Sequence, residues 1–294
     1  MAYEKQNFLD GQIVTSDNLN HMENGIIAAQ NPRNLLDNSD FRIAQAGYGG
    51  LHGTQKYACD RWYDTYGFGS FSFNESAGLT VAYGTNHAYL VQKINGVNLL
   101  HGKTVTLAMQ LSDGSVYAKS GVFVSNGASF RIDIATDKNV TLFSDRVEFV
   151  VTSGSMTIKW VALYEGSYTA DTLPAYQPKG YAAELAECQR YFWRCNNTWF
   201  AEGAGCAFSD TEFRVSIVLP QIMRVTPTMV SSTGDTTSYG IKIRTSGKAS
   251  IAPNAVTLAL KNNRIAMTFT GTFTDGELGV LRLENDYLDF SADL

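Results

Sequence analysis

Hydrophobic and polar residues alternate along two long parts of the chain, and this period of two predicts strands that each bury one face. In the first part, between residues 34 and 177, the clearest alternation covers Val105–Leu111, Phe130–Ile134 and Met156–Trp160. Turn pairs such as Asn95-Gly96 and Asn126-Gly127 separate these runs, as expected of an antiparallel sandwich with short loops. This part is therefore predicted to be a β-sandwich.

The second alternating part follows residue 210. Apolar residues occupy every other position within 213–219, 241–243, 256–260, 265–269 and 281–283. Asn262-Asn263 and Asp275-Gly276 supply turns. Because five or more strands fall within a hundred residues, this region is predicted to form a second, smaller sandwich, or else a domain that leans on its neighbours.

A different spacing marks a helix near the N-terminus. Its apolar stripe has intervals of 3, 4 and 3 residues, typical of a coiled-coil seam, and consists of Leu19, Met22, Ile26 and Ala29. Thr15 or Ser16 is the expected N-cap, and Pro32 ends the helix. A helix of about fifteen residues containing Gly25 is marginal in isolation. The stripe therefore needs a partner, either the next domain of the same chain or further copies of the chain.

Another helix is predicted in the middle of the chain. Pro174 and Pro178 mark residues 173–180 as a linker. Beyond it, helical spacing predicts an amphipathic helix of three turns, with Leu185, Cys188 and Phe192 on one face and Glu184, Glu187 and Arg190 on the others. The predicted division is thus an attachment helix (1–33), a first sandwich (34–178), and a helix with a C-terminal sandwich (179–294).

Composition and charge exclude several classes of function. The net charge of −5 and the absence of any Lys/Arg run argue against nucleic-acid binding, which needs clustered positive charge. No apolar run reaches the roughly 18 residues of a membrane span, and the first residues lack a signal-peptide pattern, so we expect no membrane insertion and synthesis in a cytoplasm. No cofactor or metal is expected: the spacing of the four cysteines does not suit a zinc site, and they are predicted to be buried free thiols, Cys59, Cys188, Cys195 and Cys206.

Three stretches resemble, in order, parts of bacteriophage tail-fibre or receptor-binding proteins. Residues 7–30 resemble the tail-attachment helix, residues 34–62, with NLLDNSDF and YACDRW, resemble the start of a jelly-roll domain, and residues 181–194 (YAAELAECQRYFWR) resemble the inter-domain helix. Weaker similarity covers 158–167 and 219–229. The resemblance implies a mainly β protein with a jelly-roll sandwich.

The same resemblance implies a function in host attachment. The chain would bind a bacterial surface polysaccharide without catalysis, as a homotrimer on the virion tail beside other tail or baseplate proteins. Three copies would also raise a weak sugar affinity through multivalency. A structural fibre or baseplate subunit without receptor contact remains an alternative.

Aromatic residues concentrate between positions 57 and 89, interleaved with Gly and Asn. Sugars stack their C–H faces on aromatic rings and bond their hydroxyls to amide, carboxylate and imidazole groups. The predicted ligand-binding residues are Tyr63, Tyr66, Tyr83, His87 and Tyr89. Strand cores also use aromatic rings, so burial of these residues is the alternative. A second aromatic cluster is predicted to form a seam between domains or another glycan platform, and consists of Tyr191, Trp193, Trp199 and Phe200.

No catalytic motif is found, and the chain is not expected to be an enzyme. It has no nucleophile elbow, zinc-protease motif, phosphate-binding loop or dinucleotide fingerprint. The alternative is a polysaccharide depolymerase, because glycoside cleavage needs only two suitably spaced carboxylates, and Asp60 and Asp64 are such a candidate pair.

Overall fold

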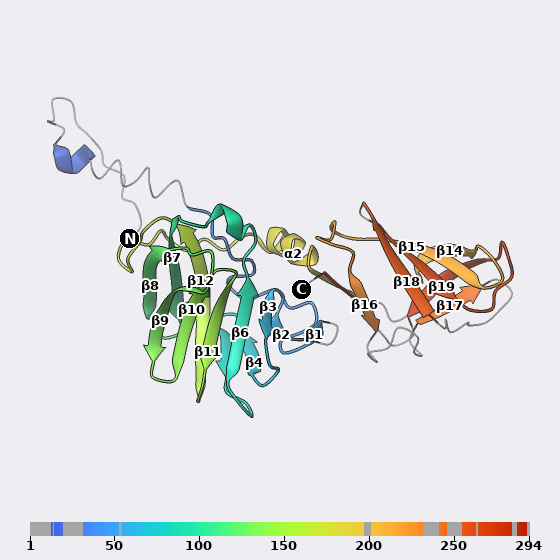
Figure 1. The fold of residues 1–294 in the computed structure, drawn as a ribbon, viewed down its shortest axis with the longest axis horizontal. Coiled ribbons are helices and arrows are strands. Elements are labelled where there is room, and N and C mark those ends of the chain that lie inside the picture. The colour runs from blue at the N-terminus through green and yellow to red at the C-terminus, as the bar shows by residue number, and fades with distance from the viewer. Residues whose placement is uncertain are drawn as a thin grey trace.

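The computed structural model describes residues 13, 15–19, 32–52, 55–196, 201–231, 241–245, 255–262, 264–283 and 287–292. Strands dominate these residues and all pair antiparallel, which confirms a mainly β protein. Figure 1 shows two β bodies with helix α2 (Tyr181–Gln189) between them. None of the helices in the described part of the chain has the length and apolarity that crossing a bilayer requires.

The first body is a sandwich of two sheets. The larger sheet contains, in spatial order, β1 (Leu51–His52), β2 (Gln55–Cys59), β3 (Trp62–Asp64), β6 (Ala88–Lys93), β11 (Arg146–Val151), β10 (Lys138–Phe143) and β9 (Ala128–Ala135). The smaller sheet contains β4 (Ser70–Asn74), β5 (Gly78–Ala82), β12 (Ser155–Glu165), β7 (Thr104–Leu111) and β8 (Val116–Val122). A short 3₁₀ helix, η1 (Val97–Leu99), precedes β7.

Several strands that follow each other in the chain pair in different sheets of this sandwich. β5 pairs with β12 in the smaller sheet, while the next strand, β6, pairs with β11 in the larger one. The strands between β6 and β12 pair with their neighbours in the chain: β7 and β8 form a hairpin, and β9, β10 and β11 form a meander. The inward faces of both sheets form one core around the fully buried Trp62, Phe123 and Phe149.

Strand β7 departs from the prediction that each strand buries one face. Its inward residues are buried as expected, but Thr106 and Ala108 on the other face are also buried. The cause is the segment after β12, which covers this face: Thr106 Oγ1 donates to the Gly166 carbonyl at 2.8 Å, and Tyr168 N donates to Thr106 Oγ1 at 3.0 Å.

Strand β12 changes partners along its length. Its first residues pair with β5, whereas Leu163 and Val161 bond to residues 34–41, which we call the entry segment, through Leu35 N and the Ser39 carbonyl, each at 2.9 Å. β5 begins at Gly78, where φ is +101° and an added Cβ would lie 2.1 Å from the Ile158 carbonyl oxygen. Only glycine fits there. A register shift between Ile158 and Trp160 accompanies the exchange.

The predicted middle helix is shorter than expected and buries a different face. α2 ends at Gln189, and Phe192 begins strand β13 (Phe192–Asn196). The buried helix residues are Glu184 and Cys188, whereas Leu185 is half-buried. Glu184 turns inward because its Oε1 accepts a hydrogen bond from Asn38 N in the entry segment at 2.6 Å, which satisfies the buried carboxylate.

The C-terminal body is a sandwich of a three-stranded and a six-stranded sheet. The smaller sheet is β13, β21 (Tyr287–Ser291) and β16 (Thr228–Ser231). The larger is β17 (Ile241–Thr245), β20 (Leu278–Leu283), β14 (Ala201–Ala207), β15 (Glu212–Val218), β19 (Arg264–Thr270) and β18 (Ala255–Lys261). Alternate residues such as Phe213, Val215 and Ile217 enter its core, as their period predicts.

The N-terminal helix is described only over its first turn. Thr15 is the N-cap, one of the two predicted positions: Thr15 Oγ1 accepts from Asn18 N at 3.3 Å, while Asn18 Oδ1 accepts from Thr15 N at 3.0 Å, as in a capping box. Leu19 is 56% exposed. The other stripe residues, Met22, Ile26 and Ala29, lie outside the described residues.

Candidate functional site

Four of the five predicted ligand-binding residues come together at one end of the first sandwich. With Phe68 they form what we call the aromatic patch: Tyr66, Phe68, Tyr83, His87 and Tyr89. The rings of Tyr66 and Tyr89 lie 4.9 Å apart edge to face, and those of His87 and Tyr89 lie 6.1 Å apart. The patch thus joins the β3–β4 loop to the β5–β6 loop and the start of β6.

A buried carboxylate shapes the β3–β4 loop, and a glycine in the β5–β6 loop allows the two loops to approach closely. Asp64 Oδ2 accepts from Gly69 N at 2.6 Å, and an added Cβ on Gly69 would lie 2.7 Å from the Phe71 ring. In the opposing loop, an added Cβ on Gly84 would lie 1.9 Å from the Phe68 carbonyl oxygen. The backbones approach too closely for any side chain at Gly84, which fixes the spacing of the rings that the loops carry.

Exposure and chemistry of the aromatic patch suit contact with a sugar. Tyr66 is 60% exposed, Tyr83 is 41% exposed and Phe68 is 40% exposed, whereas His87 and Tyr89 are half-buried. His87 Nδ1 lies 3.4 Å from the Tyr89 hydroxyl. Exposed rings beside hydroxyl and imidazole groups offer both stacking faces and hydrogen bonds.

Tyr63 lies apart from the aromatic patch. It points from β3 to the outer face of the larger sheet, with its ring 5.8 Å from that of Tyr57. Both tyrosines line a small cavity of about 110 Å³ that also involves Arg61, Tyr191 and Arg224. Because Tyr191 and Arg224 come from beyond the linker, this cavity belongs to the contact between the two sandwiches.

A second aromatic site, which the sequence did not indicate, lies where β12 exchanges β5 for the entry segment. This cavity of about 780 Å³, the aromatic pocket, is lined by Asp40, Arg42, Tyr48, Phe73, Glu75, Gly78, Lys159, Trp160, Tyr176, Pro178 and Tyr181. Tyr48 stacks on Phe73 with ring centroids 4.8 Å apart. Trp160 stacks on Tyr176 at the same centroid distance, with the ring planes 3° from parallel.

The polar groups of the aromatic pocket are partly uncommitted. Asp40 Oδ2 lies 3.1 Å from Arg42 Nε, but the buried Asp40 Oδ1 has no hydrogen-bond partner. Burial raises the pKa of Asp40, although Arg42 opposes the shift. The rings come from positions 48 to 181, so no local run of sequence signals this site.

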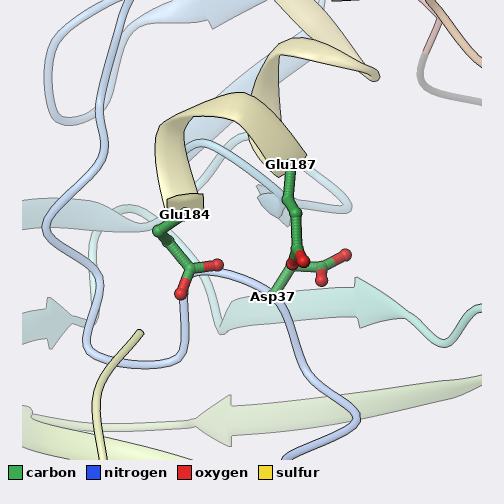
Figure 2. A group of neighbouring side chains, drawn as sticks. All are labelled: Asp37, Glu184 and Glu187. Atoms are coloured by element: carbon green, nitrogen blue, oxygen red, sulfur yellow. The ribbon is translucent and has the colours of Figure 1, made fainter. Parts of the chain in front are cut away.

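A group of three carboxylates lies between the entry segment and α2 (Figure 2). Asp37, Glu184 and Glu187 lie close enough together to suggest a cation site. The ammonium of Lys179 already occupies this position, 3.5 Å from Asp37 Oδ1 and 3.7 Å from Glu184 Oε1, and it also pairs with Glu187. Arg61 Nε adds a second cation 3.2 Å from Asp37 Oδ2. The group is therefore an ion-pair network that docks α2 on the first sandwich.

The carboxylates considered for glycoside cleavage have structural partners. Asp60 and Asp64 are each 1% exposed. Asp60 Oδ1 accepts from Gln45 N at 2.9 Å, and Asp64 holds the β3–β4 loop through Gly69 N. Neither carboxylate is accessible to a substrate in this conformation.

Of the described part of the second aromatic cluster, Tyr191 lies where the two sandwiches meet, which we call the seam, and Trp193 lies in the C-terminal sandwich. The guanidinium of Arg61 lies 3.5 Å from the ring centroid of Tyr191, a cation–π contact. The His52 ring stacks between Tyr57, at 3.8 Å, and Phe192, at 3.5 Å. Trp193 stacks on Phe290 in the C-terminal core, while Trp199 and Phe200 lie outside the described residues.

Three cysteines are buried free thiols as predicted, Cys59, Cys188 and Cys195. Cys206 is exposed, contrary to the prediction, because it lies on the outer face of the six-stranded sheet beside the buried Ala207. No protein-family model, curated protein or solved structure matches this chain.

Proposed function

We propose that the chain is a bacteriophage tail-fibre or receptor-binding protein that attaches a virion, or a tail-like particle, to a bacterial surface glycan by non-catalytic binding. The observation that carries this proposal is the aromatic patch, three of whose rings, Tyr66, Phe68 and Tyr83, are exposed on tightly packed loops. Rings held in place lose little conformational entropy on binding, and the C–H faces of a sugar stack on them.

Two other functions remain candidates with different expected behaviour. A depolymerase would shorten the glycan, and the burial of Asp60 and Asp64 disfavours the carboxylate pair that the sequence offers for that chemistry. A structural fibre or baseplate subunit would neither bind nor cleave. The exposed rings of the aromatic patch favour binding over this third function, because large exposed apolar patches mark interaction sites.

Adsorption of the purified chain to bacteria and to their extracted surface polysaccharide tests the proposal. We expect Tyr66→Ala to weaken binding about fivefold to tenfold through the loss of stacking, with an unchanged circular dichroism spectrum because Tyr66 is largely exposed. Phe208→Ala removes a ring of equal exposure, 60%, from the C-terminal sandwich and should leave binding unchanged. If the polysaccharide is shortened, the chain is a depolymerase and not a non-catalytic binding protein. If the chain does not adsorb, the structural role is favoured.

Assembly is predicted to be homotrimeric. The expected mass by light scattering is three times that of the 32.2 kDa chain. Replacing Leu19 and Ile26 with Asp should lower the mass or loosen the N-terminal bundle, since burying unpaired charge in a seam costs several kcal/mol, while both sandwiches stay folded. A monomeric mass for the unaltered chain would contradict the trimer.

A further inference from the structure

The aromatic pocket has the composition of a saccharide site and lies outside the aromatic patch. Its volume of about 780 Å³ falls in the usual range for small-ligand pockets. It is lined by two stacked ring pairs, Tyr48 with Phe73 and Trp160 with Tyr176. Tyr181, the first residue of α2, is 58% exposed at the same site.

The geometry of the pocket follows from the strand exchange on β12. β5 cannot continue along β12 beyond Gly78, and the entry segment takes over at Val161. Hydrogen bonds at the exchange hold two of the rings: Trp160 Nε1 donates to Gln110 Oε1 at 2.9 Å, and the Tyr176 hydroxyl lies 2.8 Å from Ser39 Oγ. The pocket walls are therefore fixed before any ligand arrives, which lowers the entropic cost of binding.

The charges that line the pocket balance to zero and leave two buried polar atoms without a hydrogen-bond partner, Asp40 Oδ1 and Arg42 Nε. Asp40 and Glu75 oppose Arg42 and Lys159. Arg42 forms an ion pair with Asp40 Oδ2 through Nε and donates from Nη2 to the Lys179 carbonyl. Asp40 Oδ1 is buried and lacks a donor, and a buried acceptor without a partner costs free energy until a ligand supplies one. A neutral ligand that carries hydroxyl groups meets both conditions.

The pocket and the patch lie at opposite ends of one hairpin. Phe68 and Tyr83 of the patch flank the open end of β4–β5, whereas Phe73, Glu75 and Gly78 of the pocket lie at its turn. The five residues of β4 separate the two sites by about 17 Å. One extended oligosaccharide is long enough to reach both.

We propose that the aromatic pocket binds a neutral saccharide ring of the glycan that the aromatic patch also contacts, with Asp40 Oδ1 accepting a sugar hydroxyl and the aromatic rings contacting its C–H faces. This inference rests on the proposed function, because it assigns a second subsite to the same receptor. Binding at two linked subsites raises the affinity for a chain over that for its single sugars.

A printed array of neutral, cationic and anionic bacterial oligosaccharides tests the proposal with the full-length chain, followed by calorimetry on the glycans that bind. We expect neutral oligosaccharides to bind. Tyr181→Ala and Asp40→Asn should each weaken that binding about fivefold or more, with circular dichroism unchanged. Tyr181 is exposed and Asn has the shape of Asp, so both variants should fold. Phe208→Ala is the ring-removal control.

The outcomes separate the two proposals. If both pocket variants bind a neutral glycan as the unaltered chain does while Tyr66→Ala weakens binding, the pocket assignment is overturned and the receptor function stands. Binding restricted to charged glycans also overturns the pocket assignment. An array on which no glycan binds rejects both proposals.

Discussion

The two sandwiches differ in how many polar side chains they bury. The first buries many of them around the entry segment, among them Asp37, Asn38, Asp60, Arg61 and Gln92. In the described part of the C-terminal sandwich, the buried polar residues are Thr245 and Asp289. The first sandwich therefore depends on specific hydrogen bonds and ion pairs, whereas the second depends mainly on apolar packing.

The two sandwiches also differ in the side chains on their outer surfaces. The first sandwich carries exposed rings on loops and a pocket with mixed charges. The outer face of the six-stranded sheet carries uncharged residues such as Cys206, Val218 and Ala266 beside the exposed ion pair of Arg214 and Glu212. Under the proposed function, recognition would belong to the first sandwich, and the second would serve as a scaffold.

The largest expected effect separates the two cores. Trp62 is fully buried and its Nε1 donates to the Asn38 carbonyl at 3.0 Å. Trp62→Ala should lower the free energy of unfolding of the first sandwich by about 3–5 kcal/mol and leave the second unchanged. Phe269→Ala, in the C-terminal core, should do the reverse. Calorimetry checks both, and a single shared loss of stability would show that the cores unfold as one unit.

A somewhat smaller effect is expected at the seam. Arg61 is 5% exposed, pairs with Asp37 and stacks on Tyr191. Arg61→Ala should cost about 3 kcal/mol, because it leaves a buried carboxylate short of a cation, and should separate the unfolding transitions of the two sandwiches. Arg131→Ala, at an exposed pair with Asp133, should cost less than about 1 kcal/mol. If Arg61→Ala and Arg131→Ala lower the free energy of unfolding equally, the seam does not couple the unfolding of the two sandwiches.

The smallest expected effect is a change in the pH dependence of stability, through Glu184. Burial raises the pKa of Glu184, and Asn38 N–H and Lys179 only partly oppose the shift, while Asp37 and Glu187 add to it. The folded state then binds a proton more tightly than the unfolded state, so this carboxyl stabilises the fold as the pH falls through the raised pKa and loses that contribution as the pH rises. Glu184→Gln keeps an acceptor for Asn38.

Denaturant titrations over a pH series test this linkage. At neutral pH, Glu184→Gln should lie within about 1 kcal/mol of the unaltered chain. As the pH falls, the unaltered chain should gain stability relative to the variant. Parallel pH profiles for the two proteins would contradict the raised pKa.

Sequence patterning predicted the strands well and failed where other segments intervene. The alternation in 213–219 placed β15 correctly, because one face of that strand meets the core and the other is largely exposed. β7 failed because the segment after β12 covers its outer face. The predicted stripe on α2 failed because Glu184 finds a partner in Asn38, 146 residues away in the chain. Period alone contains no information on such distant partners.

The candidate sites divide in the same way. The aromatic patch was predictable because its rings lie within about twenty residues of sequence on two adjoining loops. The aromatic pocket was not, since Tyr48, Phe73, Trp160 and Tyr176 meet only after β12 has exchanged its partners. Phe73 on β4 is half-buried, packs against the core of the first sandwich and also lines the pocket.

The seam also has a consequence for the order of folding. Gln45 Nε2 donates to the Phe192 carbonyl at 2.8 Å, and Arg194 donates to the carbonyls of Ala46 and Leu51, across about 140 to 150 residues of chain. Such contacts close a long loop, whose entropic cost is met only once the intervening sandwich is already compact. We therefore expect β13, during synthesis from the N-terminus, to dock on an already folded first sandwich and to start the second sandwich there.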